Sequence, residues 1–366
     1  MFESFEFETL TPQLASVWLG LVIGVAFGAL GLLTRFCFRR AVVGDDRRAA
    51  MGVWLTALAV AVAGTQIAVA QDLIAFDAHR FMVADLPILA IVTGGLMFGI
   101  GMVLTRGCVS RLTVLTGSGN LRAALVIIVF AIVAHATLKG VLAPLRIALG
   151  TVTVNLGDTV SLAALPGGAV VWAGLIIVIS LAIALRSGNR PLSLLGGALI
   201  GLLVPLAWVS TGFILLDDFE PIALESLSFT APATESLFFI IASTAVPAGF
   251  GSGLIGGVIL GALATALLTG RFQWQSFDSP RQTGRYLTGA TLMGTGGVLA
   301  GGCTVGAGLA GVPTLSIAAI LALTAIAAGG LIADAVMRVS VGSGAPASKQ
   351  PLVLYLSQVP MRKGSH

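Results

Sequence analysis

The stretch LPILAIVTGGLMFGIGMVLT, residues 86–105, runs for 20 positions without a charged residue and ends at Arg106. A helix needs roughly 20 apolar residues to cross the hydrocarbon core of a bilayer. Comparable apolar stretches recur near residues 15–34, 50–70, 122–143, 166–185, 192–213, 236–269, 285–301 and 314–334. The sequence therefore predicts an all-α, polytopic helical membrane protein, with residues 1–366 forming a single integral membrane domain.

The composition excludes a soluble protein. Hydrophobic residues make up 57% of the chain and charged residues only 10%, with a mean hydropathy of +1.01. Soluble domains carry about 25% charged residues, so this chain could not cover a surface that faces water. The net charge of +4 reports topology, and we expect no nucleic-acid binding.

Basic residues cluster after the first apolar stretch, in RFCFRRAVVGDDRR (35–48), whereas the N-terminal MFESFEFETLTPQ carries Glu3, Glu6 and Glu8 and does not resemble a signal peptide. Cytoplasmic loops of membrane proteins are enriched in Lys and Arg. We expect a periplasmic N-terminus, about nine crossings, and a cytoplasmic C-terminus. The basic residues expected at that terminus are Arg338, Lys349, Arg362 and Lys363.

The chain has three cysteines, and each closes a glycine-rich apolar segment. Cys37 ends GALGLLTRFC, Cys108 ends GIGMVLTRGC, and Cys303 ends GTGGVLAGGC. Three separated cysteines do not suggest a disulfide framework. Isolated histidines such as His79 and His135 offer no ligand set, so we expect no metal and no cofactor.

The segment that ends at Cys108 matches the segment that ends at Cys303 at an offset of 195 residues, with five identities. A weaker match sets residues 24–30 on 257–263 and places Cys37 opposite Gly270; chance similarity explains it equally well. The pattern predicts two pseudo-symmetric halves, near 15–143 and 236–334, joined by helices near 144–235. Internal duplication is common in transporters.

Forty-seven glycines are present, and most suit close helix packing. Consecutive glycines destabilise a helix by about 1 kcal/mol each, and non-helical backbone at membrane depth occurs where it lines an enclosed cavity. We therefore expect residues 105–119 and 300–313 to form loops that re-enter the protein from short helices. Their free N–H groups would favour an anion.

Two interpretations of the cysteines remain open. A single buried cysteine is usually a small hydrophobe in the core, whereas three in one repeated frame favour a function. In an apolar passage the neutral thiol is favoured over the thiolate, and a neutral S–H is a weak donor. Weak donors along a path suit conduction, since an ion must both bind and leave.

Arginine supplies positive charge near two of the cysteines. Arg106 and Arg111 flank Cys108, and guanidinium groups bind oxyanions well; these arginines could equally mark the cytoplasmic membrane end. The candidate substrate-binding or relay residues are Cys37, Cys108, Cys303, Gly107, Gly302, Thr304, Arg106 and Arg111.

The segments LTRGCVSRLTVLTGSGNLR (104–122) and GTGGVLAGGCTVGAGLAGVPTLS (294–316) resemble the signature segments of the YeeE/YedE family of sulfur-transport membrane proteins. TRFCFRRA (34–41) and the FQW at 272–274 are also similar to that family. The resemblance implies thiosulfate uptake across the bacterial inner membrane, with Cys37, Cys108 and Cys303 relaying the ion. It also implies a compact, hourglass-like helical body and a separate cytoplasmic sulfur-carrier protein as a partner.

Other functions remain open. The cysteines could belong to a membrane sulfurtransferase that forms a persulfide, or to a permease for another sulfur- or selenium-containing anion. Covalent chemistry needs an activated thiolate beside a base or a strong positive field, and no histidine is near a cysteine in the sequence. We therefore expect a permease and not an enzyme.

Overall fold

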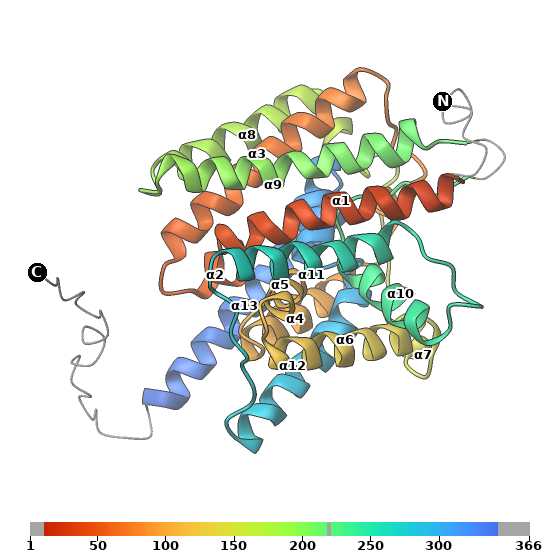
Figure 1. The fold of residues 1–366 in the computed structure, drawn as a ribbon. Helices are drawn as coiled ribbons and strands as arrows, with labels where there is room; N and C mark the ends of the chain where they lie inside the picture. The colour runs from red at the N-terminus through yellow and green to blue at the C-terminus, as the bar shows by residue number, and fades with distance from the viewer. Residues whose placement is uncertain (1–10, 218–220, 343–366) are drawn as a thin grey trace, which may run out of the picture.

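The computed structural model describes residues 11–217 and 221–342. Within these ranges, nine helices are long and apolar enough to cross a membrane (Figure 1). They are α1 (Pro12–Leu33), α3 (Arg47–Ala70), α4 (Ile88–Leu104), α6 (Leu121–Lys139), α8 (Gly168–Leu185), α9 (Pro191–Val209), α11 (Phe250–Leu268), α12 (Pro280–Leu299) and α13 (Ile317–Gly342). The prediction of an all-α polytopic membrane protein is confirmed.

Shorter elements connect the long helices. The α-helices are α2 (Phe38–Val43), α5 (Val109–Gly117), α7 (Ala143–Gly150) and α10 (Thr230–Ile241). The 3₁₀-helices are η2 (Leu162–Ala164) and η5 (Val312–Thr314), and the π-helices are η3 (Ser210–Ile214) and η4 (Thr304–Gly311). Strands β1 (Asp85–Leu86) and β2 (Val154–Asn155) pair antiparallel.

Two expectations from the sequence are wrong in detail. The apolar stretch near 236–269 is two helices, because α10 ends at Ile241 and α11 begins at Phe250; Pro247 lies in the break, and proline ends or kinks helices. The segments 105–119 and 300–313 are mainly helical, since they contain α5, η4 and η5; their non-helical residues are the turns before α5 and η4 and the turn at 118–119 after α5.

Helices α1 and α11 pack along each other through glycines that face the opposite backbone. A Cβ at Gly24 would collide with Gly257, and a Cβ at Gly257 would collide with Gly24 and with the carbonyl oxygen of Leu21. One turn earlier the contact is again reciprocal: a Cβ at Gly20 would lie 3.0 Å from the Leu254 nitrogen, and a Cβ at Gly253 would lie 3.0 Å from the Leu21 nitrogen. Close approach of this kind requires small residues at the contact.

Helices α4 and α12 form a second close pair. Gly94 packs against Gly296, and Gly101 packs against Gly289, so each contact recurs with its partners exchanged at the 195-residue offset. In both helix pairs, segments that match in the sequence lie side by side. This arrangement is what an internal duplication would give, and the duplication itself stays a prediction.

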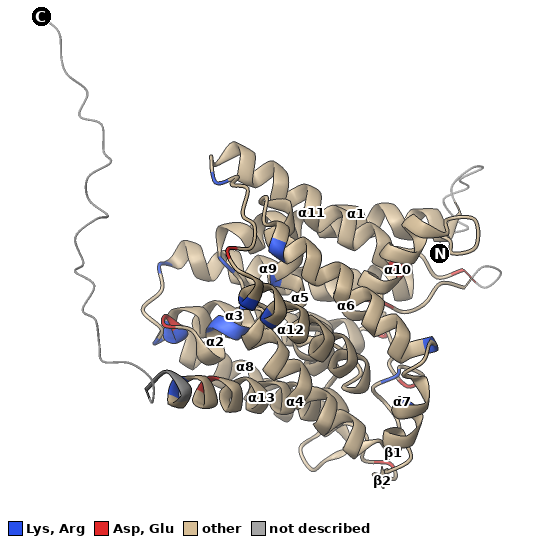
Figure 2. Cartoon of the chain, turned by 90° about the horizontal axis from the view of Figure 1, so that it is seen from below, with Lys and Arg blue, Asp and Glu red and all other residues tan. Residues whose placement is uncertain are grey.

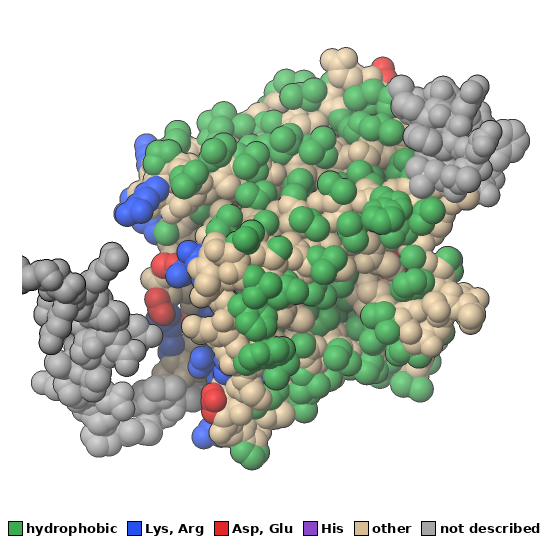
Figure 3. Space-filling model, viewed as in Figure 1, with side chains coloured by type: hydrophobic (Ala, Val, Ile, Leu, Met, Phe, Trp, Pro, Cys, Tyr) green, Lys and Arg blue, Asp and Glu red, His purple; other side chains and the backbone are tan. Residues whose placement is uncertain are grey.

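The surface divides by charge. In Figure 3, hydrophobic side chains cover the face in view, and Lys and Arg gather at the end of the molecule where α1 ends. In Figure 2, charged residues lie around α2 and, at the opposite end, near α7. Some charged residues used for the expected orientation lie outside the described residues, namely Glu3, Glu6, Glu8, Lys349, Arg362 and Lys363.

Candidate functional site

The same turn follows α1, α4 and α12. Each helix ends at a leucine, and the second residue after it adopts a left-handed φ; these residues are Arg35 (54°), Arg106 (61°) and Gly301 (75°). Two residues further on, a cysteine becomes the N-cap of the next short helix: Cys37 for α2, Cys108 for α5 and Cys303 for η4. The repeated cysteine frame is therefore a repeated piece of structure.

A fourth turn of this kind follows α11 without a cysteine. That helix ends at Leu268, and Gly270 has a φ of 64°. Gly270 therefore corresponds to Arg35, and Phe272 corresponds to Cys37. The sequence match had placed Gly270 opposite Cys37, which is two residues out of register with the turn. The chain then runs to a bridge between Gln275 and Asn120 and forms no short helix there.

All three thiols are free and buried. The Cys108 thiol interacts with that of Cys37 and with the Thr304 side chain, and its Sγ lies 3.2 Å from Ser110 Oγ. Cys303 precedes Thr304 and accepts a hydrogen bond from its own helix, from the backbone N–H of Gly306 at 3.4 Å. Since Cys108 interacts with both of the other thiols, we refer to the three as the thiol row, in the order Cys303, Cys108, Cys37.

Hydroxyl groups beside this row lack hydrogen-bond partners. Thr304 is 1% exposed, and its Oγ1 makes no hydrogen bond of normal length, although it faces the Cys108 thiol at longer range. The hydroxyls of Thr230 and Ser228 are also buried and unpartnered among the described residues. Buried donors without acceptors are costly, so these groups are free to bind an anion.

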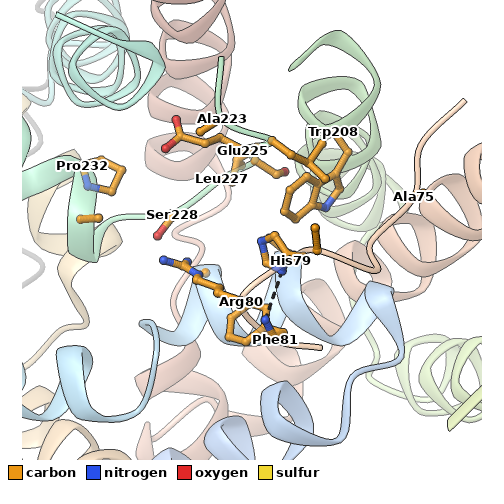
Figure 4. A pocket seen from close by; sticks show the side chains of 16 residues that line it. Ala75, His79, Arg80, Phe81, Trp208, Ala223, Glu225, Leu227, Ser228 and Pro232 are labelled. Atoms are coloured by element: carbon orange, nitrogen blue, oxygen red, sulfur yellow. Dashed lines mark hydrogen bonds between the residues drawn. The ribbon is translucent and has the colours of Figure 1, made fainter. Parts of the chain in front are cut away.

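A pocket of about 440 Å³ opens near Cys303, and we call it the vestibule. Gly306, Ser228 and Arg80 line it, and Figure 4 shows Arg80 and Ser228 pointing into the same space. Gly306 lies so close to Ser228 that a Cβ there would be 2.8 Å from Oγ. Gly306, whose N–H is capped by the Cys303 thiol, therefore lies in the vestibule wall.

Two titratable side chains of the vestibule lie outside the spanning helices. Burial raises the pKa of Glu225 to about 7, and repulsion by Glu235 adds to this while attraction by Arg80 opposes it. Burial lowers the pKa of His79 to about 4, and the Arg80 charge acts in the same direction. At pH 7, His79 is neutral and Glu225 is close to its midpoint.

A second pocket, of about 210 Å³, lies at the arginine-rich end; we call it the arginine pocket. Cys37 lines it directly, together with Arg35, Arg40 and Asn189. Cys37 lines the arginine pocket, and Cys303 contacts Gly306 of the vestibule wall, so the two ends of the thiol row lie next to different pockets.

The remaining candidate residues divide into two groups. Arg111 donates a hydrogen bond to the Gly31 carbonyl oxygen at 3.0 Å, and its charge acts on the Cys37 and Cys108 thiols. Arg106, in contrast, is exposed at its turn. Gly107 and Gly302 are buried in the turns; a Cβ at Gly302 would lie 3.0 Å from the Ala307 nitrogen, so glycine is needed there.

Several lining residues were not predicted from the sequence. Arg80, Ser228 and Glu225 come from the loops that follow α3 and precede α10, and they share no motif with the cysteine frames. Ser110 was also missed, although it stands two residues after Cys108. For metals, the described residues contain no group of three His, Cys, Asp or Glu side chains that could hold an ion.

Within the described residues, nine apolar helices enclose three buried thiols, which defines a polytopic membrane protein. Residues 27–332 match the profile of the family described as sulphur transport, and the chain belongs to that family. It is 25% identical to the thiosulfate transporter TsuA of Spirochaeta thermophila, covering 84% of this chain and 94% of the relative. It is 24% identical to the thiosulfate transporter TsuA of Escherichia coli, covering 79% and 86%.

Proposed function

We propose that this protein is a permease that carries thiosulfate into the cell across the bacterial inner membrane. The observation that carries the proposal is the row Cys303, Cys108, Cys37 between the vestibule and the arginine pocket. Both relatives are named thiosulfate transporters, and family membership supports sulfur transport.

The vestibule has the chemistry to capture an oxyanion. Arg80 supplies the positive charge, and the unpartnered hydroxyls of Ser228 and Thr304 supply donors at successive depths. Hydrogen bonds from neutral donors to a charged group contribute about 1.5–3 kcal/mol each. An anion that moves inward from Arg80 therefore loses the contact with the guanidinium group and gains hydrogen bonds from the Ser228 and Thr304 hydroxyls before it reaches the first thiol.

The thiols then suit passage better than retention. A neutral S–H is a weak donor, so each thiol holds the anion loosely, and conduction needs binding that is weak enough for release. Thiosulfate itself carries a soft terminal sulfur, which matches thiol sulfur in polarisability. The row would therefore favour thiosulfate over sulfate, which presents oxygen alone.

The direction of uptake follows from charge. Arginines gather around the arginine pocket, and positively charged loops face the cytoplasm. The vestibule would then face the periplasm, and Arg35 and Arg40 would receive the anion after Cys37. A separate cytoplasmic sulfur-carrier protein would consume the ion at this side and keep its concentration low.

Growth of an uptake-deficient bacterium on thiosulfate as sole sulfur source tests the proposal. Cys108→Ala and Cys303→Ala should abolish growth while membrane levels of the protein stay normal, and the Ser variants should be nearly as poor because oxygen is not soft. Thr137→Val, a buried change in α6, serves as the matched control. Normal growth of both Ala variants would refute the thiol route.

A further inference from the structure

We propose that a pocket separate from the thiol row is a second anion site, which binds a small tetrahedral oxyanion through Arg80 and Arg146. The pocket has a volume of about 230 Å³. It lies between the beginnings of α4 and α13, the end of α12, and α7. The proposal does not depend on thiosulfate transport, because sulfate or phosphate would serve as ligand equally well.

The pocket suits one small anion. A water molecule takes about 30 Å³ in the liquid, so 230 Å³ has room for a small ion with a few waters. Much of the wall is apolar, from residues such as Pro87, Ile91 and Leu299. Positive charge that faces an apolar wall is poorly screened, which strengthens its attraction for an anion.

The charge in the pocket is one-sided. Both charged residues of the lining are arginines, and no Asp or Glu lines it among the described residues. Arg146 Nε is buried and has no hydrogen-bond partner within the described part of the chain. Arg80 stacks on Phe81 with its guanidinium carbon 5.2 Å from the ring centre; no described carboxylate lies within salt-bridge distance of it, and Glu225 and Glu235 attract it from the vestibule side.

Other arginines of the protein have a carboxylate partner, which Arg80 and Arg146 lack at salt-bridge distance among the described residues. Arg338 Nε donates a hydrogen bond to Asp334 at 2.8 Å, and Arg40 Nε donates one to Asp46 at 3.2 Å. A guanidinium group presents five donors in a fixed fork that fits the oxygens of sulfate or phosphate. An unpartnered buried donor is costly, so an anion that accepts from Arg146 Nε is favoured.

The second site adjoins the proposed transport route. Arg80 lines both this pocket and the vestibule. Gly301, two residues before Cys303, forms part of the pocket lining. An anion held here would draw on the same guanidinium that attracts an anion into the vestibule, so the two sites share one charge.

Sulfate binding to the purified full-length protein tests the site. The protein is placed in nanodiscs of zwitterionic phosphatidylcholine, and binding of radiolabelled sulfate is measured by equilibrium dialysis. Arg146→Gln should weaken sulfate binding at least tenfold, whereas Arg338→Gln, the control at an arginine whose Nε is paired with Asp334, should leave it unchanged. Unchanged sulfate affinity in Arg146→Gln, or no sulfate binding by the wild type, would overturn the proposal.

A second variant guards against misfolding. Val83 lines the pocket and is 38% exposed, so Val83→Trp can fill the pocket from its edge without disturbing the core. We expect it to lower sulfate affinity as Arg146→Gln does, with both variants eluting as single species in size exclusion. Wild-type affinity in a well-folded Val83→Trp would place sulfate elsewhere.

A lipid phosphate could present the same chemistry to these arginines, and nanodiscs that contain phosphatidylglycerol separate the two sources. If a free oxyanion is the ligand, sulfate affinity should stay within twofold of its value in phosphatidylcholine. If sulfate binding is lost in the anionic nanodiscs and raising the sulfate concentration does not restore it, the pocket holds a lipid headgroup and the free-ion proposal is overturned.

Discussion

Replacing Thr304 by valine separates the role of its hydroxyl in transport from any role in folding. Valine keeps the shape of threonine and removes the Oγ1 hydroxyl, which is buried and lacks a hydrogen bond of normal length. Because nothing in the resting protein is lost with this hydroxyl, folding should not suffer. The same hydroxyl faces Cys108, where the proposed route passes from Cys303.

The expected magnitudes follow from these contacts. A hydrogen bond to a charged group contributes about 1.5–3 kcal/mol, and about 1.4 kcal/mol corresponds to a factor of ten in rate. Thr304→Val should therefore slow thiosulfate uptake by about 10- to 100-fold. Removing a buried unpartnered donor should leave the free energy of unfolding unchanged or raise it by up to about 1 kcal/mol.

Initial uptake rates in proteoliposomes and thermal melting of the same preparation measure the two effects. The control is Thr137→Val: Thr137 is equally buried, but its hydroxyl already bonds to the Val133 carbonyl oxygen at 2.8 Å. This control should lose some stability and keep its uptake rate. Wild-type uptake by Thr304→Val, or a fall in its melting temperature that matches the fall in uptake, would refute the reasoning.

Three further predictions concern the vestibule, the α1–α11 contact and the arginine pocket. Burial raises the pKa of Glu225 to about 7, so this carboxyl group ionises as external pH rises from 6 to 8. Uptake should fall over this range, because the ionised carboxylate, beside Arg80 and Glu235, repels a dianion. Glu225→Gln should flatten the pH profile of uptake, and an unchanged slope would count against this role of Glu225. Gly257→Ala should lower the melting temperature by an amount that corresponds to about 1–3 kcal/mol of overpacking, while Gly256→Ala, with open space around it, should not. Protection of Cys37 from a small alkylating reagent by thiosulfate, measured by mass spectrometry, should be at least threefold, and no protection would favour a packing role for this thiol.

The sequence predicted the helices well because the bilayer imposes a simple rule. A charge-free stretch such as 86–105 has few alternatives to a spanning helix, and α4 occupies most of it. The prediction of a loop at 300–313 failed because the local preference of glycine for non-helical backbone did not decide the structure of this buried segment. The glycines at 306 and 308 disfavour a helix, yet both lie in η4, where Ser228 and Leu323 pack so closely that a larger side chain would collide with them.

The candidate site was predicted in part. The repeated frame pointed to Cys37, Cys108 and Cys303, and all three thiols are buried in the fold, with Cys108 near Cys37. The vestibule could not be predicted, because Arg80 and Ser228 lie in loops nearly 150 residues apart in the sequence and meet only in the folded chain. No local pattern marks such residues.

The fourth turn shows a limit of sequence matching. The register that aligns Gly24 with Gly257 holds along the helix contact and slips by two residues before the turn, where Gly270 takes the left-handed position of Arg35. An ungapped match cannot detect such a slip. The backbone dihedral angles identify Phe272, and not Gly270, as the counterpart of Cys37.

The most direct test of the central claim is uptake of thiosulfate labelled separately at its terminal and its central sulfur atom, measured in proteoliposomes that contain the purified protein. A permease delivers the whole ion, so both labels should enter at the same initial rate, and Cys108→Ser should reduce both together by at least tenfold. If only the terminal sulfur label enters the proteoliposomes or becomes bound to the protein, the protein transfers sulfur and does not transport thiosulfate. If both labels enter Cys108→Ser liposomes at the wild-type rate, the ion does not pass along the thiols.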